Sequence, residues 1–172
     1  MATTRRSMID RMKGAAMLSP STYEEVENDP TATGQAAIIV VLGAIATAIG
    51  AAGLGLTGLF AVSVSALVGW LLVAGVMYLI GDKLLGGTAT WGELMRTIGF
   101  AHTPRLFLVL AGIPVIGGIV AFLVAIWLLV AFIVAIRHAL DVGTGKAIVT
   151  AVLGWIALAL LNVVAANLAG VI

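Results

Sequence analysis

Apolar residues follow one another in three long runs that contain no charged side chain. The first run covers residues 35–54, the second covers 58–80, and the third follows Lys146 to the C-terminus. A helix that crosses a membrane needs about 20 apolar residues, so each run predicts a transmembrane helix. The first run begins too far from the start, and is too long, to predict a signal peptide.

The uncharged stretch from Leu106 to Ile136 has a different pattern, because Pro114 and the pair Gly117–Gly118 interrupt it. At about 1.5 Å per residue, this stretch is too long for one crossing and too short for two complete ones. A turn within the segment IPVIGG would divide it into two arms. The three runs and the two arms together predict five membrane segments.

The distribution of basic residues supports this arrangement. With a hairpin at IPVIGG, every Lys and Arg falls on one side of the membrane, which the positive-inside rule makes the cytoplasmic side. The sequence therefore predicts an all-α polytopic membrane helix bundle with five membrane segments, N-terminus cytoplasmic and C-terminus outside. Four segments with both ends inside are the alternative. The basic residues are Arg5, Arg6, Arg11, Lys13, Lys83, Arg96, Arg105, Arg137 and Lys146.

The segment WGELMRTIGFAHTPRLF at 91–107 brings ionisable side chains to the entrance of the hairpin. Thr90 and Glu93 have the spacing of a capping box, so we expect a helix to begin at Trp91. An indole ring at this point suits the interface between membrane and water.

Two paths are open to the chain between this helix and the hairpin. A helix that entered directly would carry Arg105 about 21 Å deep, where a charge costs about 2.5–3.5 kcal/mol. We favour a bent path, in which residues 91–103 lie near the surface and Pro104 marks the bend. Arg105 then reaches the headgroups along its apolar stem.

Small residues recur at helical spacing in the predicted membrane helices. Gly43, Thr47 and Gly50 share one face of the first helix, and such faces let helix backbones approach closely. Packing within one bundle is the favoured interpretation, and an oligomer interface is the alternative.

Residues 1–34 are expected to form a cytoplasmic amphipathic segment that precedes a membrane domain at 35–172. Over residues 4–17, apolar side chains share one helical face and basic side chains surround it, which is typical of a helix on an anionic membrane surface. Ser21 and Glu24 have capping-box spacing and predict a second short helix after Pro20. A partly disordered tail is the alternative, with the acidic residues at 24–29 as a solvated run.

Composition indicates a lipid environment and narrows the possible chemistry. Hydrophobic residues make up 62% of the 172 residues and charged residues 10%, against about 45–50% and about 25% in soluble domains. We therefore expect an integral membrane protein, and the abundance of small residues favours a prokaryotic plasma (inner) membrane. The absence of cysteine excludes disulfides, thiolate nucleophiles and cysteine-ligated metals.

The sequence contains no catalytic motif. The segment DVGTGKA at 141–147 fails the phosphate-binding-loop pattern, because Leu140 and Ala147 stand where Gly and Ser or Thr are required. We expect no enzyme activity, no catalytic residue, no cofactor and no bound metal.

Two sets of polar residues are candidates for contacts. The first set is expected on the cytoplasmic side, as contacts to a partner or to lipid headgroups. An interfacial salt-bridge cluster that fixes helix ends, or a proton or ion pathway, could also explain it. Asn162 and Asn167 predict intramembrane polar contacts, either interhelical hydrogen bonds or a solute site. The first set comprises Glu93, Arg96, His102, Arg105, Arg137 and His138.

Three stretches resemble one known family. They are LSPSTYEEVENDP before the first membrane helix, TATWGELMRTIGFAHTP before the third segment, and AIWLLVAFIVAIRHAL in the fourth. In these stretches the chain resembles the Yip (Ypt-interacting protein) domain family of multispanning membrane proteins. The residues that match its pattern W-x-E-L…G-x-A…P are Trp91, Glu93, Leu94, Gly99, Ala101 and Pro104, and Trp127 and His138 fit a later signature.

The resemblance implies five membrane segments and a cytoplasmic N-terminus, so that residues 35–172 would form a Yip-like domain. In eukaryotes the family is associated with small Rab/Ypt-type GTPases, vesicle traffic and membrane shaping.

Three functions follow as hypotheses. The favoured one is a non-catalytic scaffold or accessory subunit of a membrane assembly, because packing surfaces are abundant and catalytic chemistry is absent. A transporter or channel for a small solute, ion or lipid is the alternative, and a membrane-shaping protein is the second alternative. The expected partners are membrane lipids and other membrane protein subunits or a second copy, and no nucleic acid.

Overall fold

The computed structural model describes residues 6–51 and 55–168, and within these ranges the chain is helical with short connections. Four helices of this part of the chain are long and apolar enough to cross a membrane. They confirm the three predicted apolar runs as helices and add one arm of the hairpin. The four are α3 (Ala32–Gly50), the continuous helix Leu56–Leu84, α6 (Gly117–Ala139) and the part of α7 from Thr144 to Val164.

Shorter helices fill the remaining described chain. The helix Leu56–Leu84 consists of α4 (Leu56–Tyr78) and a π-helical end, η1 (Leu79–Leu84), and α7 extends over Thr144–Leu168. The segment between η1 and α6 contains α5 (Trp91–Ala101) and the 3₁₀ helix η2 (Thr103–Gly112). Two helices, α1 (Met8–Ala16) and α2 (Pro20–Asn28), precede the bundle.

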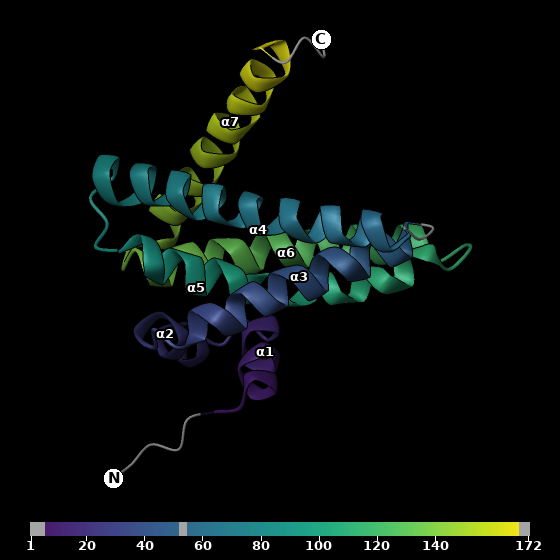
Figure 1. Cartoon of the computed structure of the whole chain (residues 1–172). Coiled ribbons are helices and arrows are strands. Elements are labelled where there is room, and N and C mark those ends of the chain that lie inside the picture. The colour runs from purple at the N-terminus through teal and green to yellow at the C-terminus, as the bar shows by residue number, and fades with distance from the viewer. Residues whose placement is uncertain (1–5, 52–54, 169–172) are drawn as a thin grey trace.

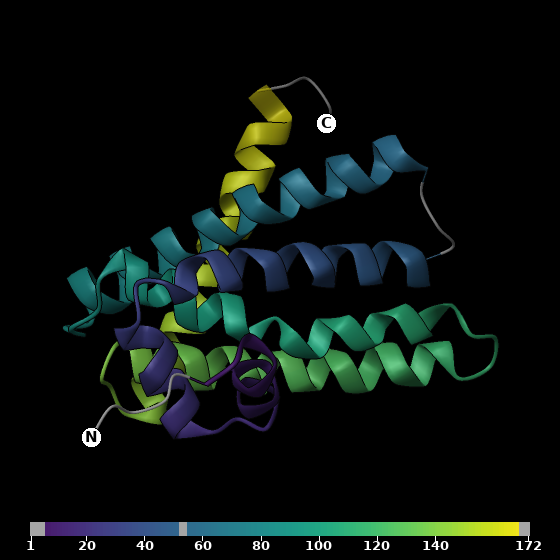
Figure 2. The ribbon, with the colours of Figure 1, turned by 60° about the horizontal axis from the view of Figure 1, so that its bottom comes forward.

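The helices α3, α4 and α6 run side by side, and α5 followed by η2 lies along them (Figures 1 and 2). The segments α5 and η2 follow α3 in the same direction, because Gly99 packs on Ala36 and Gly112 packs on Gly50. The helices α1 and α2 lie against one side of this bundle, whereas α7 leads away from it towards the C-terminus.

The predicted turn within IPVIGG is confirmed. Residues 113–116 form a tight turn in which the Ile116 amide donates to the Pro114 carbonyl at 2.9 Å and the Gly117 amide donates to the Ile113 carbonyl at 2.9 Å. Val115 has a φ of 73° and is almost fully exposed. The turn reverses the chain, so that η2 and α6 pack against each other.

The helix expected at Trp91 also begins there. The Thr90 hydroxyl accepts a hydrogen bond from the Glu93 amide at 3.2 Å, and the Glu93 carboxylate accepts one from the Thr90 amide at 2.7 Å. Both halves of the predicted capping box are therefore present. The α-helix ends near Pro104, as expected, and continues as η2 because proline lacks the amide that an α-helical hydrogen bond needs.

The expectation that residues 91–103 lie near the membrane surface needs correction, because α5 runs along α3 inside the bundle. Leu94, Ile98 and Phe100 have no exposed area, and α5 is enclosed by α2, α3, α4 and α6. The indole of Trp70 donates to the Met95 carbonyl at 2.9 Å, which fixes α5 against α4. The apolar face of α5 thus builds the core, and the segment cannot lie flat outside it.

The small residues of α3 pack inside the bundle, as the favoured interpretation predicted. A Cβ atom at Gly43 would lie 3.2 Å from the Cβ of Arg105. A Cβ atom at Gly50 would collide with the carbonyl oxygen of Leu108, and one at Gly112 would lie 2.9 Å from the Gly50 carbonyl oxygen. Glycine at these positions lets the backbones of α3 and η2 come into direct contact.

Candidate functional site

Side chains from several helices meet where α1 and α2 rest on the bundle, at what we call the N-terminal junction, defined by Arg11, Tyr23, Arg96, Trp127 and His138. Arg11 is 2% exposed although it is charged. Its guanidinium donates to Glu25 at 2.9 Å, to Asp29 at 2.7 Å and to Gln35 at 3.2 Å. A buried charge is tolerated when ion pairs and hydrogen bonds compensate its lost hydration. Arg11 therefore ties α1 to α2 and to α3.

Arg96 connects α5 to the C-terminal end of α2. Its Nε donates to the carbonyl oxygens of Val26 at 3.0 Å and Glu27 at 2.9 Å, and its Nη2 donates to the Glu27 carbonyl as well. The last carbonyls of a helix lack partners within the helix and carry partial negative charge. The guanidinium satisfies this end of α2 and compensates its dipole.

The C-terminal end of α1 is bound in the same manner. The Tyr23 hydroxyl donates to the Ala15 carbonyl at 3.2 Å, and the Trp127 indole donates to the Ala16 carbonyl at 2.7 Å. Tyr23 in turn stacks on His138 of α6, with ring centroids 6.1 Å apart. The junction therefore holds the ends of two short helices through donors on α2, α5 and α6.

Carboxylates gather on the side of the junction next to Glu27. The pKa of Glu27 is raised to about 7, mainly by burial and also by the nearby charges of Asp141 and Glu93, although Arg96 acts to lower it. The Asp141 carboxylate accepts from the Thr88 hydroxyl at 3.3 Å. Glu27 therefore changes charge near neutral pH in direct proximity to the α2 end that Arg96 binds.

The six predicted contact residues do not form one cluster. Glu93 and Arg96 belong to the junction side, where His138 lies 3.9 Å from Glu24, and Arg137 is exposed. His102 lies elsewhere, with Nδ1 2.8 Å from the Ile98 carbonyl oxygen and its ring against Phe132. Arg105 does not extend towards the end of the bundle where α3 and α5 begin, as its expected path to the headgroups required, but lies midway along α3 against Gly43 and binds Thr47.

The N-terminal segment also differs from its prediction. The two short helices are present, but α2 begins at Pro20 with Ser19 before it, and Ser21 and Glu24 form no capping box. Arg11 does not face outwards, and Glu25 and Asp29 bind it, so these acidic residues are not a solvated run. Arg5 lies outside the described residues. The sequence shows that basic and acidic residues occur close together before the first membrane helix. Their spacing alone does not show which basic residue pairs with which acidic residue.

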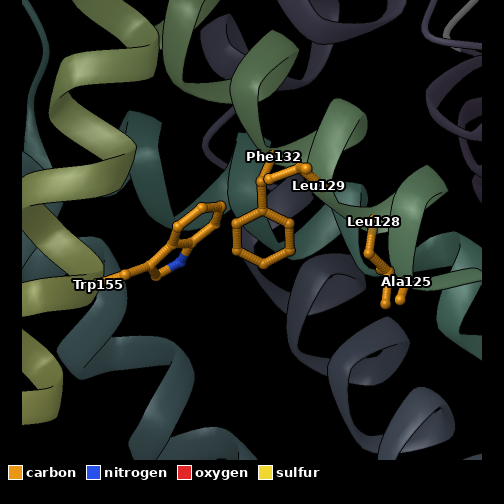
Figure 3. A pocket seen from close by; sticks show the side chains of 5 residues that line it. All are labelled: Ala125, Leu128, Leu129, Phe132 and Trp155. Carbon is orange, nitrogen blue, oxygen red and sulfur yellow. The ribbon is translucent and has the colours of Figure 1, made fainter. Parts of the chain in front are cut away.

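An apolar groove, which we call the wedge, lies between α6 and α7. Figure 3 shows Trp155 of α7 and Phe132 of α6 facing each other across it. Its cavity has a volume of about 360 Å³, and its lining contains no charged side chain. The lining residues are Ala125, Leu128, Leu129, Phe132 and Trp155.

The two asparagines of α7 form no interhelical hydrogen bond within the described residues. Asn162 donates to the Leu158 carbonyl at 2.8 Å and Asn167 donates to the Val163 carbonyl at 2.9 Å, both within their own helix. Both side chains are exposed, because this part of α7 leads away from the bundle (Figure 1). Their polar groups are therefore presented outwards.

A second cavity lies between α3 and α4. It has a volume of about 450 Å³ and is lined by small residues, by Thr47 and Ser65, and by Arg105. Sequence reasoning identified Arg105 but gave no sign of Ser65, which belongs to a helix distant in the sequence.

Comparison with known proteins identifies the chain. The Yip1 domain family model matches residues 15–166. This match covers most of the chain, which therefore belongs to the Yip1 domain family. No curated protein and no solved structure matches it.

Proposed function

We propose that this Yip1-domain protein is a non-catalytic scaffold or accessory subunit of a membrane assembly. We further propose that the protein itself has five membrane segments, the third of which is formed by α5 and η2 together. The observation that supports the proposal is the wedge between α6 and α7. A membrane helix that leads away from its own bundle exposes a large apolar surface and leaves room for a further helix.

The chemistry of the wedge indicates what fits it. Its lining is apolar, and Trp155 is 37% exposed at its mouth. Within the described residues, the Trp155 indole N–H has no hydrogen-bond partner, and the Asn162 amide oxygen has none either. Polar groups on an exposed membrane helix are stabilised by acceptors and donors on a neighbouring helix. We infer that the occupant is a transmembrane helix of a partner subunit.

Native mass spectrometry of the tagged protein, extracted gently from its own membranes, tests this proposal. Trp155→Ala should reduce the amount of the bound subunit more than about tenfold, because aromatic anchors dominate interfaces of this kind. Leu153→Ala is the matched control, because Leu153 is exposed on the same helix but does not line the wedge. An unchanged complex with Trp155→Ala would remove the wedge as the contact.

A crosslinking experiment locates the partner independently. The chain has no cysteine, so a cysteine-directed photo-crosslinker can be placed at one position by a single substitution. A crosslinker at Leu129→Cys should capture the partner, whereas one at Leu153→Cys should not. The mass of the captured product distinguishes a second copy from another protein, and the absence of any stoichiometric partner would overturn the scaffold function.

A further inference from the structure

The side chain of Arg105 follows α3 towards the hairpin end of the bundle. Its Cβ, Cγ and Cδ atoms lie against Gly43, and its Nε donates to the Thr47 hydroxyl at 3.0 Å. Thr47 itself donates to the Gly43 carbonyl at 2.8 Å, which orients its oxygen as an acceptor for Arg105. The side chain therefore lies along α3, with its stem against Gly43 and its guanidinium beside Thr47, which is one helical turn later in α3.

The charge of Arg105 is not balanced by the protein around it. Within the residues that the structure describes, no carboxylate forms an ion pair with Arg105, and Thr47 is its hydrogen-bond partner. Arg11, by contrast, binds two carboxylates and an amide. A guanidinium has five N–H donors, so most of the donors of Arg105 remain available.

The available donors face a cavity with a further hydroxyl. The cavity of about 450 Å³ is bounded by Thr47 on α3 and Ser65 on α4, and its other wall residues are alanine and valine. This volume lies in the range of small-ligand sites. Ser65 is exposed, and its hydroxyl forms no hydrogen bond within the described residues, whereas that of Ser63 donates to the Leu59 carbonyl at 2.7 Å.

The cavity lies near one end of the bundle, where apolar side chains are exposed. Thr47 precedes Gly50, the last residue of α3, by about 4.5 Å along the helix axis. Figure 2 shows α3 and α4 diverging towards this end, which is also the end of the hairpin at 113–116. The outer faces of both helices are apolar here, with Ile49 and Val64 exposed. A headgroup in the cavity could therefore keep its acyl chain against these residues.

We propose that Arg105, Thr47 and Ser65 form a binding site for the anionic headgroup, phosphate or carboxylate, of a membrane amphiphile that enters between α3 and α4. The fork of the guanidinium matches both anions. Ser65 supplies a second donor from the opposite wall, and the bound anion neutralises a charge that no carboxylate of the described ranges neutralises. This site is separate from the wedge between α6 and α7, so either proposal can fail without the other.

Binding of defined amphiphiles to the full chain, measured by native mass spectrometry after delipidation, tests the site. Phosphatidylglycerol, oleate and inorganic phosphate are added separately. Arg105→Gln should weaken phosphatidylglycerol or oleate binding about tenfold, Arg105→Lys should weaken it less, and Ser65→Ala should weaken it a few fold. Ser63→Ala is the matched control, because it removes a hydroxyl from the same helix that does not line the cavity, and it should leave binding unchanged.

Four results would overturn the proposal. Arg105→Gln could bind amphiphiles as the unmodified protein does, or Ser63→Ala could weaken binding as much as Ser65→Ala. Inorganic phosphate could bind while neither amphiphile does, which would make the ligand a soluble anion. A protein subunit could be lost with Arg105→Gln while lipid binding stays unchanged, which would make the anion a side chain of that subunit. If Arg105→Gln fails to fold, the comparison of Ser65→Ala with Ser63→Ala still decides.

Discussion

Replacing Arg11 by methionine would keep the length and the apolar stem of the side chain but remove the guanidinium that ties α1 to α2 and α3. Asp29 would lose its buried charge partner at 2.7 Å, and Glu25 and Gln35 would each lose a hydrogen bond. We expect α1 and α2 to separate from the bundle more often, while the apolar helices of the bundle stay folded.

The contacts that remain set the magnitude. Breaking a buried ion pair from one side costs about 3–5 kcal/mol. Asp29 keeps hydrogen bonds from the Thr31 amide at 3.0 Å and hydroxyl at 2.6 Å, and Glu25 keeps Arg6 at 3.2 Å. The cost should therefore lie near the lower limit, at about 3 kcal/mol, which increases the undocked population on the order of 100-fold.

Hydrogen exchange in lipid nanodiscs, followed by mass spectrometry, measures this population in α1 and α2. Arg6→Met is the control, because Arg6 is 45% exposed and its pair with Glu25 is solvated. Such a pair contributes less than about 1 kcal/mol. If both variants accelerated exchange equally, or if Arg11→Met changed it by less than about 1 kcal/mol, the buried network would not be what holds the N-terminal helices.

Two further predictions concern the junction and the packing of α3. The pKa of Glu27 is raised from 4.5 to about 7, so docking of α2 loses stability as the pH rises between these values. Glu27→Gln should remove this loss. In thermal unfolding at pH 8 the variant should be more stable than the unmodified protein by about 1 kcal/mol, after allowance for solvent screening. At pH 4 the two proteins should unfold alike. Gly50→Ala would place a methyl group against the Leu108 carbonyl and should lower stability by about 1–3 kcal/mol, whereas Gly34→Ala, which meets nothing within 4 Å, should not lower it. Equal melting temperatures for the two alanine variants would contradict the proposed contact between α3 and η2.

Features that depend on neighbouring residues could be predicted from the sequence. The apolar runs, the capping box of Thr90 and Glu93, and the turn at IPVIGG each follow from residues a few positions apart. The places where the chain stops being α-helical near Pro104 and reverses near Pro114 have the same local cause.

Features that depend on distant residues could not be predicted in this way. Arg96 and Arg105 were placed together because both precede the hairpin, yet Arg96 binds carbonyls at the end of α2 and Arg105 binds Thr47 of α3. The eight residues between them cover the second half of α5 and the start of η2, which separates the two guanidinium groups along the bundle. Asn162 was expected to bind another helix or a solute, but within the described residues its amide donates to Leu158 of its own helix.

The residues that match the family pattern serve the fold, whereas the stretch 125–140, which also carries the resemblance, supplies four of the five residues that line the wedge. Glu93 caps α5, Gly99 lets α5 contact Ala36, Trp127 binds the end of α1, and His138 stacks on Tyr23. These contacts would position α5 and the N-terminal helices in the same manner whatever the bundle binds. Arg105, Ser65 and Trp155, which line the two cavities, are outside that pattern. The pattern residues therefore hold the architecture together, and the identity of the partner and of the amphiphile must be sought in side chains that this pattern does not include.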